Sequence, residues 1–515
     1  MEARILWADD EIDLLKPHIL FLEQKGYQID TVNNGADAVD MAAETHYDII
    51  FLDENMPGLN GLETLAKIKT QDQTVPIIMI TKSEEEYIME EAIGGQISDY
   101  LIKPVNPNQI LLSLKKNLKR KDLVSQKTSH DYQIEFRQIG MRLNDRLDAQ
   151  EWSDIYRQLV NWEIKLEGSN DEGMKEIFSM QKKEANTQFC RFVDYNYRDW
   201  LDGDDDAPLL SHQLLKEKVF SSLGNEPLFL VVIDNLRFDQ WLVLKPLISE
   251  YFNVDDESLF YSILPTATHY ARNAIFAGLM PAEIEKKHPN LWLNENDEGG
   301  KNMYEKKLLA ENLKRNHLNI KMSYNKVVKL DFAKRLVDRF NDLLQNDLNV
   351  IVYNFVDMLS HARTEMEVIK ELADDESAYR SLTASWFNHS PLRDILRKIA
   401  ENGHRLMITT DHGTIRVDSP VKIVGDKHTN TNLRYKVGKN LSYNEKEVLF
   451  SSDPEAIRLP RENVSSSFVF AKENDFFAYP NNFNYYANYY RDTFQHGGVS
   501  LEEMIIPFVE LSPKS

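Results

Sequence analysis

The sequence predicts an α/β multidomain protein in which two α/β domains flank a central helical bundle. Short apolar strands alternate with amphipathic helices at the start of the chain, and the same alternation returns after an acidic loop near residue 205. The region between them has helical spacing and contains no proline between Pro107 and Pro208. We therefore expect α/β domains at 1–120 and 207–515, joined by a helical bundle at 121–206.

Length and composition agree with this organisation. A chain of 515 residues is too long to fold around a single hydrophobic core of ordinary size. Its content of 42% hydrophobic and 28% charged residues is typical of globular proteins. The net charge of −22 argues against nonspecific binding to duplex DNA, whose phosphates would repel it. A single cysteine, Cys190, fits a reducing compartment. The sequence has neither a signal-peptide pattern nor an apolar run of about 18 residues. We expect a cytoplasmic protein without membrane insertion.

In the first domain, nearly all-apolar strands indicate a parallel sheet covered by helices on both faces. The expected strands are Arg4–Ala8, Gln28–Val32, Tyr47–Leu52, Pro76–Thr81 and Tyr100–Ile102. The expected helices are Leu14–Lys25, Ala36–Glu44, Gly61–Lys69, Ser83–Gly94 and Pro107–Lys119.

Reactive side chains follow these strands at their carboxyl ends, where a doubly wound sheet places its active site. The residues in question are Asp9, Asp10, Asp53, Thr81 and Lys103. Carboxylates that converge on one edge repel each other unless a hard cation joins them, which implies Mg²⁺. With the cation bound, one carboxylate can accept a phosphoryl group while the lysine offsets the developing charge.

The segments ILWADDE, DIIFLDENMPGLNG, ITK and DYLIKP resemble the CheY-like (flavodoxin-like) receiver domain of response regulators. This resemblance implies that Asp53 is the phosphoacceptor and that a sensor histidine kinase is the partner. It implies Mg²⁺ ligands at Asp9 (through water), Asp10, Asp53 and the carbonyl of Asn55. It also implies a hydroxyl switch, an aromatic switch and a phosphate-binding lysine at Thr81, Tyr100 and Lys103.

In the middle region, apolar residues recur at three- and four-residue steps, which predicts several helices. The clearest sets are Trp152, Ile155, Leu159 and Trp162, and Phe189, Phe192 and Val193. We expect a break near Gly168–Asn170 and a domain boundary at the acidic loop Asp202–Asp206.

In the last domain, potential metal ligands follow four apolar strands in succession. The expected strands are Pro227–Ile233, Leu259–Leu264, Asn349–Val356 and Arg405–Thr410, with long insertions between Leu279 and Leu348. The ligand-type residues after them are Asp234, Thr266, Thr268, Asp357, His361, Asp411 and His412, followed by His496 near the C-terminus. Each could instead be a helix cap, a turn residue or a core residue, but their succession favours a metal site. Oxygen and imidazole donors suit Zn²⁺ or Mn²⁺ better than Ca²⁺.

The order of these residues resembles the alkaline phosphatase superfamily and, within it, the PglZ domain over about 212–515. The resemblance implies one zinc site at Asp234, Thr268, Asp411 and His412, and a second at Asp357, His361 and His496. It implies that Thr268 is the nucleophile, and PTATH lacks the Cys-x-Pro-x-Arg signature of sulfatases. Candidates for holding the transferred phosphoryl group, by position, are Arg237, Arg272 and Asn273, so monoester or diester preference stays open.

The segment Lys422–Lys439 is unusually basic for an acidic chain. Arg434 and Lys436 flank Tyr435 in it, an arrangement that could grip an oligonucleotide backbone and stack a base. A solvated surface loop is the alternative interpretation.

Receiver, helical middle and PglZ-type domain in this order resemble the response-regulator family associated with type IX secretion in Bacteroidota. The resemblance implies a zinc-dependent phosphodiesterase acting on oligonucleotides, with cyclic ones as candidates. It also implies phosphorylation-promoted homodimers and regulation of secretion without duplex DNA binding. The alternative is a signalling scaffold that binds a sigma factor or a secretion component, with a metal domain that is structural or acts on another phosphoester.

Overall fold

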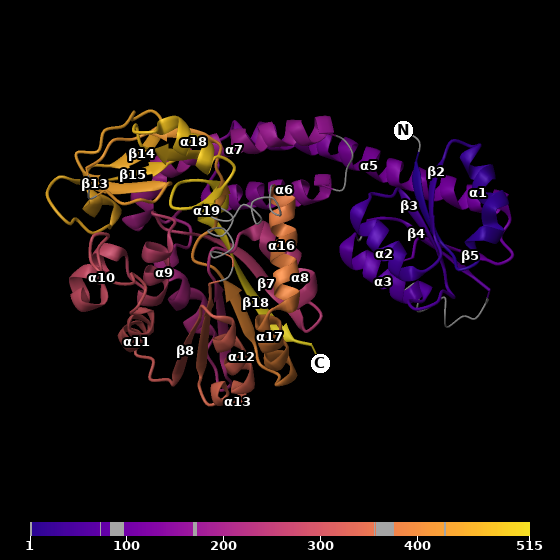
Figure 1. Ribbon diagram of the computed structural model, residues 1–515. Helices are drawn as coiled ribbons and strands as arrows, with labels where there is room; N and C mark the ends of the chain where they lie inside the picture. The colour runs from indigo at the N-terminus through magenta and orange to yellow at the C-terminus, as the bar shows by residue number, and fades with distance from the viewer. Residues whose placement is uncertain are drawn as a thin grey trace. The chain divides into compact units, whose positions relative to one another are not determined.

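A computed structural model describes residues 3–72, 74–82, 97–167, 172–354, 356, 375–426 and 429–514 (Figure 1). The chain forms two compact units. One comprises Met1–Ile134 with Gly168–Met174, and the other comprises Glu135–Glu167 with Lys175–Ser515.

The first unit is built on an all-parallel sheet with strand order β2-β1-β3-β4-β5. Its strands are β1 Arg4–Ala8, β2 Gln28–Val32, β3 Ile49–Asp53, β4 Ile77–Thr81 and β5 Asp99–Ile102. Its helices are α1 Lys16–Glu23, α2 Gly35–Glu44, α3 Gly61–Gln71 and the start of α5 Pro107–Leu143. Leu6 and Trp7, neighbours on β1, belong to separate buried clusters, because successive side chains of a strand point to opposite faces. Both faces of the sheet are therefore covered, as the apolar strands predict.

Helix α5 is longer than expected. The sequence predicts a last helix over Pro107–Lys119, but the helix continues to Leu143. No proline interrupts this stretch, and the first glycine after Pro107 is Gly140, so nothing in the sequence stops the helix earlier. The helix predicted at Ser83–Gly94 lies outside the described residues.

The middle region continues with α6 Ala149–Glu167 and α7 Glu172–Leu201, which lie on either side of the break expected near Gly168–Asn170. Trp152 of α6 packs against Phe189 of α7, with ring centroids 5.4 Å apart. Phe189 also contacts Tyr261, whose hydroxyl donates to the Ala149 carbonyl at 2.7 Å. Helices α6 and α7 therefore share a core with the strand that carries Tyr261 in the second unit.

The main sheet of the second unit is six-stranded and mixed, with order β7-β18-β10-β6-β9-β8. Its strands are β6 Leu228–Ile233, β7 Phe252–Tyr261, β8 Met322–Val327, β9 Leu348–Tyr353, β10 Leu406–Thr409 and β18 Ile505–Pro513. Strands β8, β9, β6 and β10 are parallel, whereas β18 runs antiparallel to both β10 and β7. Strands β6 and β10 are neighbours, so their carboxyl ends meet at one edge.

Helices and small sheets complete this unit. The longer helices are α8 Phe238–Ile248, α9 Thr268–Ala277, α11 Glu305–Arg315, α12 Leu330–Asp338, α16 Glu376–His389, α17 Pro391–Glu401 and α18 Phe483–Tyr490. The shorter ones include α10 Pro281–Lys287, α13 Phe340–Leu343 and α19 Leu501–Met504. A three-stranded sheet holds β13 Tyr435–Lys439, β14 Val448–Ser451 and β15 Ser466–Ala471. In Figure 1, α9, α10 and α11 lie on one side of the main sheet and α8, α16 and α17 on the other.

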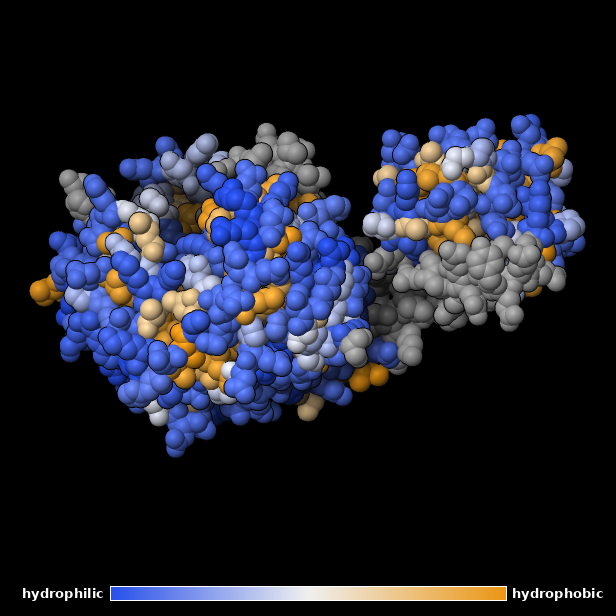
Figure 2. All heavy atoms as spheres, turned by 90° about the horizontal axis from the view of Figure 1, so that it is seen from below, coloured by the Kyte–Doolittle hydropathy of each residue, from blue (hydrophilic) through white to orange (hydrophobic). Residues whose placement is uncertain are grey.

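The surface is mainly hydrophilic on the face seen in Figure 2, where apolar side chains form scattered patches. Among the helices of the described residues, none is long and apolar enough to cross a membrane.

Candidate functional site

The first unit brings three carboxylates and a lysine together at the carboxyl edge of its sheet. One ligand atom from each of Asp9, Asp10 and Asp53 lies within 4.8 Å of the others. The Lys103 ammonium is 2.9 Å from Asp9 Oδ2 and 2.8 Å from Asp53 Oδ1. Burial raises the pKa of Asp53, and the hydrogen bond from Lys103 opposes that shift. The three carboxylates, of which Asp9 and Asp53 are buried and Asp10 is exposed, supply the oxygen donors that a hard divalent cation fits.

The other predicted receiver residues lie on or just after the neighbouring strands β3, β4 and β5. Thr81 ends β4, is buried, and donates its hydroxyl hydrogen to the Glu54 carboxylate. Asn55 is exposed in the loop after β3. Tyr100 on the edge strand β5 is 42% exposed.

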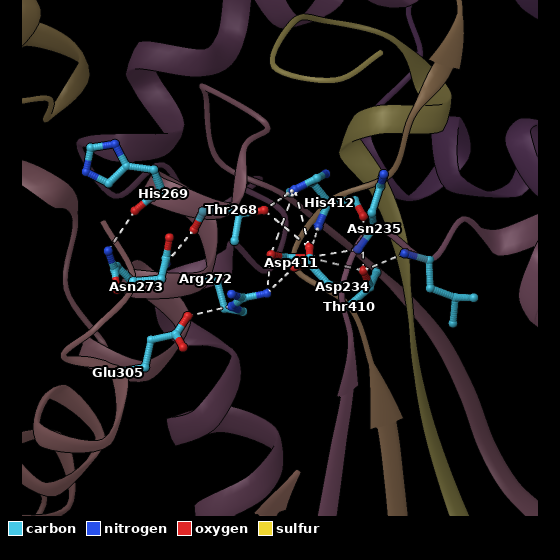
Figure 3. A network of polar contacts seen from close by, with 12 residues as sticks. Asp234, Asn235, Thr268, His269, Arg272, Asn273, Glu305, Thr410, Asp411 and His412 are labelled. Atoms are coloured by element: carbon cyan, nitrogen blue, oxygen red, sulfur yellow. Dashed lines mark hydrogen bonds and ion pairs between the residues drawn. The ribbon is translucent and has the colours of Figure 1, made fainter. Parts of the chain in front are cut away.

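In the second unit, the ends of β6 and β10 and the start of α9 converge on one point (Figure 3). Asp234 directly follows β6. Thr410 directly follows β10, and Asp411 and His412 come next along the chain. The Thr268 hydroxyl is 3.2 Å from Asp234 Oδ1 and 3.1 Å from His412 Nε2. Asp234, Asp411 and His412 are each 0% exposed, and their ligand atoms lie within 4.8 Å of one another. These four predicted residues therefore form one cluster, in which Asp234, Asp411 and His412 are buried and Thr268 is half-buried.

The backbone around the cluster is specialised. Asn235 has φ 66°, a left-handed conformation that asparagine tolerates better than most residues. In this turn the Asn235 amide donates to Asp411 Oδ1 at 3.2 Å. A side chain at Gly413 would overlap the carbonyl oxygen of Glu502 on α19, so the chain after His412 passes close to that helix.

The donor chemistry of the cluster fits a transition metal. Two carboxylates and one imidazole are ligand types of Zn²⁺ sites. The His412 Nδ1 atom hydrogen-bonds to the Gly413 carbonyl at 3.1 Å, which directs Nε2 toward Asp234 and Asp411. Such an outer contact fixes the ring orientation of a metal-binding histidine. The residues that would hold the ion are Asp234, Asp411 and His412, with the Thr268 hydroxyl beside them.

His496 lies next to this cluster. Its ring is stacked on that of His412, with centroids 4.3 Å apart and an interplanar angle of 20°. The two-stranded sheet of β11 Ile415–Arg416 and β17 Phe494–Gln495 brings the two histidines together, because each lies within three residues of one of its strands. Asp357 and His361, the other two ligands predicted for a second metal, lie outside the described residues.

Arg272 is buried among carboxylates. Its guanidinium contacts Asp234 Oδ2 and Glu305 Oε1, both at 2.5 Å, and lies 3.7 Å from Asp411 Oδ2. Although burial lowers the pKa of Arg272, the attraction of Asp234, Glu305 and Asp411 raises it above the usual value. The structure therefore places Arg272 as a counter-charge to the cluster.

The remaining candidates for substrate contact are also buried and engaged. Asn273 Nδ2 donates to the carbonyls of His269 and Lys301, at 2.8 and 3.0 Å. Arg237 forms an ion pair with Asp239 at 2.5 Å and another with Glu376 at 2.5 Å.

Arg434 and Lys436 are 0% exposed. Arg434 pairs with Glu503 at 2.6 Å, and Lys436, on β13, donates to the Asn430 carbonyl at 2.9 Å. At these two positions the structure differs from both interpretations of the basic segment, which require accessible side chains. Lys436 also donates to the Tyr479 hydroxyl at 3.1 Å, so each of the two side chains has a distant partner, Glu503 or Tyr479, that the local sequence does not reveal.

A cavity of about 480 Å³ next to His496 was not predicted from the sequence. It is lined by Glu295, Asn430, Thr431, Asn432, Leu433, Tyr435, Tyr489, Tyr490, Gln495 and His496. The signal that could have indicated it is the α18 sequence FNYYANYY, in which tyrosine and asparagine recur just before His496.

Three family models match the chain in succession. They are the response regulator receiver domain over 5–115, the PorX response regulator linker domain over 122–201, and the BREX system PglZ alkaline phosphatase-like domain over 214–511. The predicted α/β multidomain fold and the predicted order of receiver, helical middle and PglZ domain are thereby confirmed. A receiver domain takes its phosphoryl group from a phosphodonor such as a histidine kinase.

Curated relatives match over the receiver. The transcriptional regulatory protein ResD of Bacillus subtilis is 36% identical over 119 residues, which are 23% of this chain and 49% of that protein. SrrA of Staphylococcus aureus, also a transcriptional regulatory protein, is 33% identical over 120 residues, with shares of 23% and 49%. The chain thus spans about half the length of these relatives.

Solved structures match the same part of the chain. The Vibrio cholerae chemotaxis protein CheY4 is 28% identical and covers 22% of this chain and 98% of its own, with a TM-score of 0.22. A receiver domain from Clostridium thermocellum is 26% identical and covers 24% and 98%, with a TM-score of 0.23.

Proposed function

The chain belongs to the PglZ family of alkaline phosphatase-like domains, and from this premise we propose that it is a two-component response regulator with a zinc-dependent phosphodiesterase as its output. The observation that carries the proposal is the contact of Thr268 with both Asp234 and His412 inside a buried cluster of metal-ligand side chains. A half-buried hydroxyl held between a carboxylate and an imidazole is the arrangement of an activated nucleophile.

The residues of the cluster have distinct tasks in this proposal. A bound Zn²⁺ would lower the pKa of the hydroxyl and offset charge on the phosphoryl oxygens. Asp234 Oδ1 accepts the hydrogen of the Thr268 hydroxyl and thereby orients its oxygen for attack. Thr268 is also the first residue of the ten-residue helix α9, whose N-terminal amides favour an anionic group. Burial of Asp234, Asp411 and His412 lowers the local dielectric constant and so strengthens their electrostatic interactions.

The cavity beside His496 supports an oligonucleotide as the substrate. Tyrosine rings can stack on bases, and asparagine and glutamine side chains can hydrogen-bond to base edges. Tyr489, 41% exposed, and Tyr435 both line the cavity. Among the described residues that line it, the only carboxylate is Glu295, which already accepts hydrogen bonds from Tyr270 and Tyr435. A largely neutral, aromatic and amide-lined cavity suits a nucleobase better than a strongly charged group.

Phosphorylation of Asp53, with Mg²⁺ held by the receiver carboxylates, is the proposed input. The Lys103 ammonium, already in contact with Asp53, would neutralise the added phosphoryl charge. On the strength of the family resemblance, we include phosphorylation-promoted homodimers, a sensor histidine kinase as donor, and a role in type IX secretion. A sigma factor or a secretion component is a further candidate partner.

The test is hydrolysis of bis-(p-nitrophenyl) phosphate, with and without added Zn²⁺, by wild type, Thr268→Ala and Thr268→Ser. We expect zinc-dependent turnover in wild type, loss of turnover in the alanine variant, and partial turnover in the serine variant, which keeps a hydroxyl. Unchanged turnover in Thr268→Ala would contradict the proposal. Absence of turnover despite bound zinc would favour the scaffold alternative.

A further inference from the structure

Helix α7 of the middle region contacts two segments close in sequence to proposed site residues, one before Thr268 and one after His496. The Tyr197 hydroxyl accepts a hydrogen bond of 2.8 Å from the Leu264 amide, four residues before Thr268. The Cys190 thiol donates to the Val499 carbonyl at 3.2 Å, three residues after His496. Tyr197 and Cys190 are both buried. The helix therefore packs against the chain segments that lead to Thr268 and away from His496.

Asn186 of α7 uses both its amide oxygen and its amide nitrogen to hold a third segment, at the start of α19. It is 2% exposed, and both ends of its amide are engaged. Its Oδ1 accepts from the Leu501 amide at 2.8 Å, and its Nδ2 donates to Glu502 Oε2 at 3.0 Å. The Lys182 ammonium, one turn earlier on α7, is 3.1 Å from Glu502 Oε1. Both carboxylate oxygens of Glu502 are thus held by α7.

The segment that Asn186 holds continues directly to the centre. Glu503, the next residue, accepts from the Gly498 amide through Oε1 at 2.9 Å and from the Gly413 amide through its carbonyl at 3.1 Å. Gly498 is two residues from His496, and Gly413 follows His412. The start of α19 therefore links α7 to the backbone beside both stacked histidines.

We propose that Asn186 is a positioning residue of the hydrolase centre, which makes α7 a part of that centre rather than a spacer between domains. The inference rests on the proposed function, since it assigns Asn186 a role in holding the His412 and His496 backbones. Contacts that orient metal ligands from outside the ligand set typically account for about 10- to 100-fold in metal affinity or activity. A purely architectural asparagine would affect stability without affecting either quantity.

The experiment uses the full-length protein and compares Asn186→Ala with Asn196→Ala. Asn196 lies on the same helix, but its amide donates to the Phe192 carbonyl of that helix. We would measure kcat and KM for bis-(p-nitrophenyl) phosphate, zinc affinity by competition with a chromophoric chelator, and Tm. For Asn186→Ala we expect kcat or zinc affinity to fall by about 10- to 100-fold with a smaller change in KM. For Asn196→Ala we expect wild-type values.

A rescue pair separates positioning from general damage. Asn186→Asp removes the donor to Glu502 and adds a second carboxylate beside it, so we expect a loss like that of Asn186→Ala. In Asn186→Asp combined with Glu502→Gln, a donor and an acceptor face each other again, and we expect kcat and zinc affinity to recover at least tenfold.

A lowered Tm with unchanged kcat and unchanged zinc affinity in Asn186→Ala would overturn the inference, as would equal losses in Asn196→Ala. If wild type binds zinc but hydrolyses nothing, the proposed function fails. The zinc affinities of the same variants then still decide whether Asn186 positions the site.

Discussion

Replacement of Arg272 by methionine tests the charge balance of the hydrolase centre. Its guanidinium, 1% exposed, is in contact with Asp234 and Glu305 and close to Asp411. Methionine keeps the long, unbranched shape but leaves these buried carboxylates without that positive charge. Removal of one partner from a buried ion pair costs about 3–5 kcal/mol, because the remaining charge stays desolvated.

Two features of the structure adjust this magnitude. Lys326, 3.1 Å from Glu305, still neutralises part of the charge after the substitution, which favours the lower end of the range. Zinc bound by Asp234 and Asp411 would supply positive charge at the same place. We therefore expect a destabilisation of about 3 kcal/mol in chelator-treated protein and a clearly smaller one with saturating Zn²⁺.

The assay is urea denaturation followed by tryptophan fluorescence, with and without Zn²⁺. Arg397→Met is the matched control, since Arg397 is 48% exposed and pairs with Asp394 on the helix surface. Surface pairs of this kind contribute about 0–1 kcal/mol. A loss below about 1 kcal/mol for Arg272→Met in chelator-treated protein, or a loss that zinc does not change, would refute this account of Arg272.

Three further predictions concern other parts of the chain. Burial lowers the pKa of Lys436 from 10.5 to about 7. Between pH 10.5 and 7 the unfolded chain therefore binds a proton at this lysine that the folded chain does not bind. Because of this difference, the free energy of unfolding falls as the pH falls through this window. Lys436→Met should remove this pH dependence and raise the free energy of unfolding at pH 7 by up to about 5 kcal/mol. The prediction would be contradicted if the free energy of unfolding changed equally with pH in wild type and in Lys436→Met. Asp53→Asn should abolish phosphorylation by acetyl phosphate with Mg²⁺, and a shifted band of this variant in phosphate-affinity electrophoresis would show that Asp53 is not the acceptor. Tyr489→Ala should raise KM for a dinucleotide by roughly 5- to 150-fold, from about 1–3 kcal/mol of stacking, with little effect on bis-(p-nitrophenyl) phosphate; an unchanged KM would remove Tyr489 from the substrate site.

The parts of the site that lie at strand ends were predictable from the sequence. Strands β6 and β10 are fully buried and are apolar along all or most of their length, so the acidic residues Asp234 and Asp411 just beyond them stood out in the sequence. The sequence does not reveal that β6 and β10 are neighbours, because the order of strands depends on contacts between distant segments. That adjacency is what brings Asp234 within reach of His412.

Strands β8 and β18 were not predicted from the sequence, because neither has a clear apolar strand pattern. Strand β8 lies at the sheet edge, and its MSYNKV sequence is mostly half-buried, so it lacks an apolar run. Strand β18 contains Pro507 and Glu510, residues that weaken a strand pattern, and its antiparallel pairing with β7 depends on residues about 250 positions away.

Contacts over long sequence separations account for the rest. Asn186 and Glu502 are 316 positions apart, and Arg434 and Glu503 are 69 apart, so local patterns could indicate neither pair. Arg434 and Lys436 look like surface residues in the sequence because isolated basic residues are rarely buried. Their burial follows from partners that only the folded chain supplies.

The most direct test of the central claim is to trap the covalent adduct that a nucleophilic Thr268 must form. Attack on bis-(p-nitrophenyl) phosphate joins Thr268 Oγ1 to phosphorus, releases p-nitrophenolate and passes the hydroxyl proton to solvent. Water later breaks the new bond between Oγ1 and phosphorus. Zinc-loaded protein would be mixed with excess substrate, quenched in acid within the first turnover, digested and analysed by mass spectrometry. The account predicts a p-nitrophenyl phosphoryl group on the peptide that contains Thr268. In the Thr268→Ser variant it predicts the group at position 268 and at no other residue. An adduct on another residue would contradict it, as would turnover by Thr268→Ala at the wild-type rate.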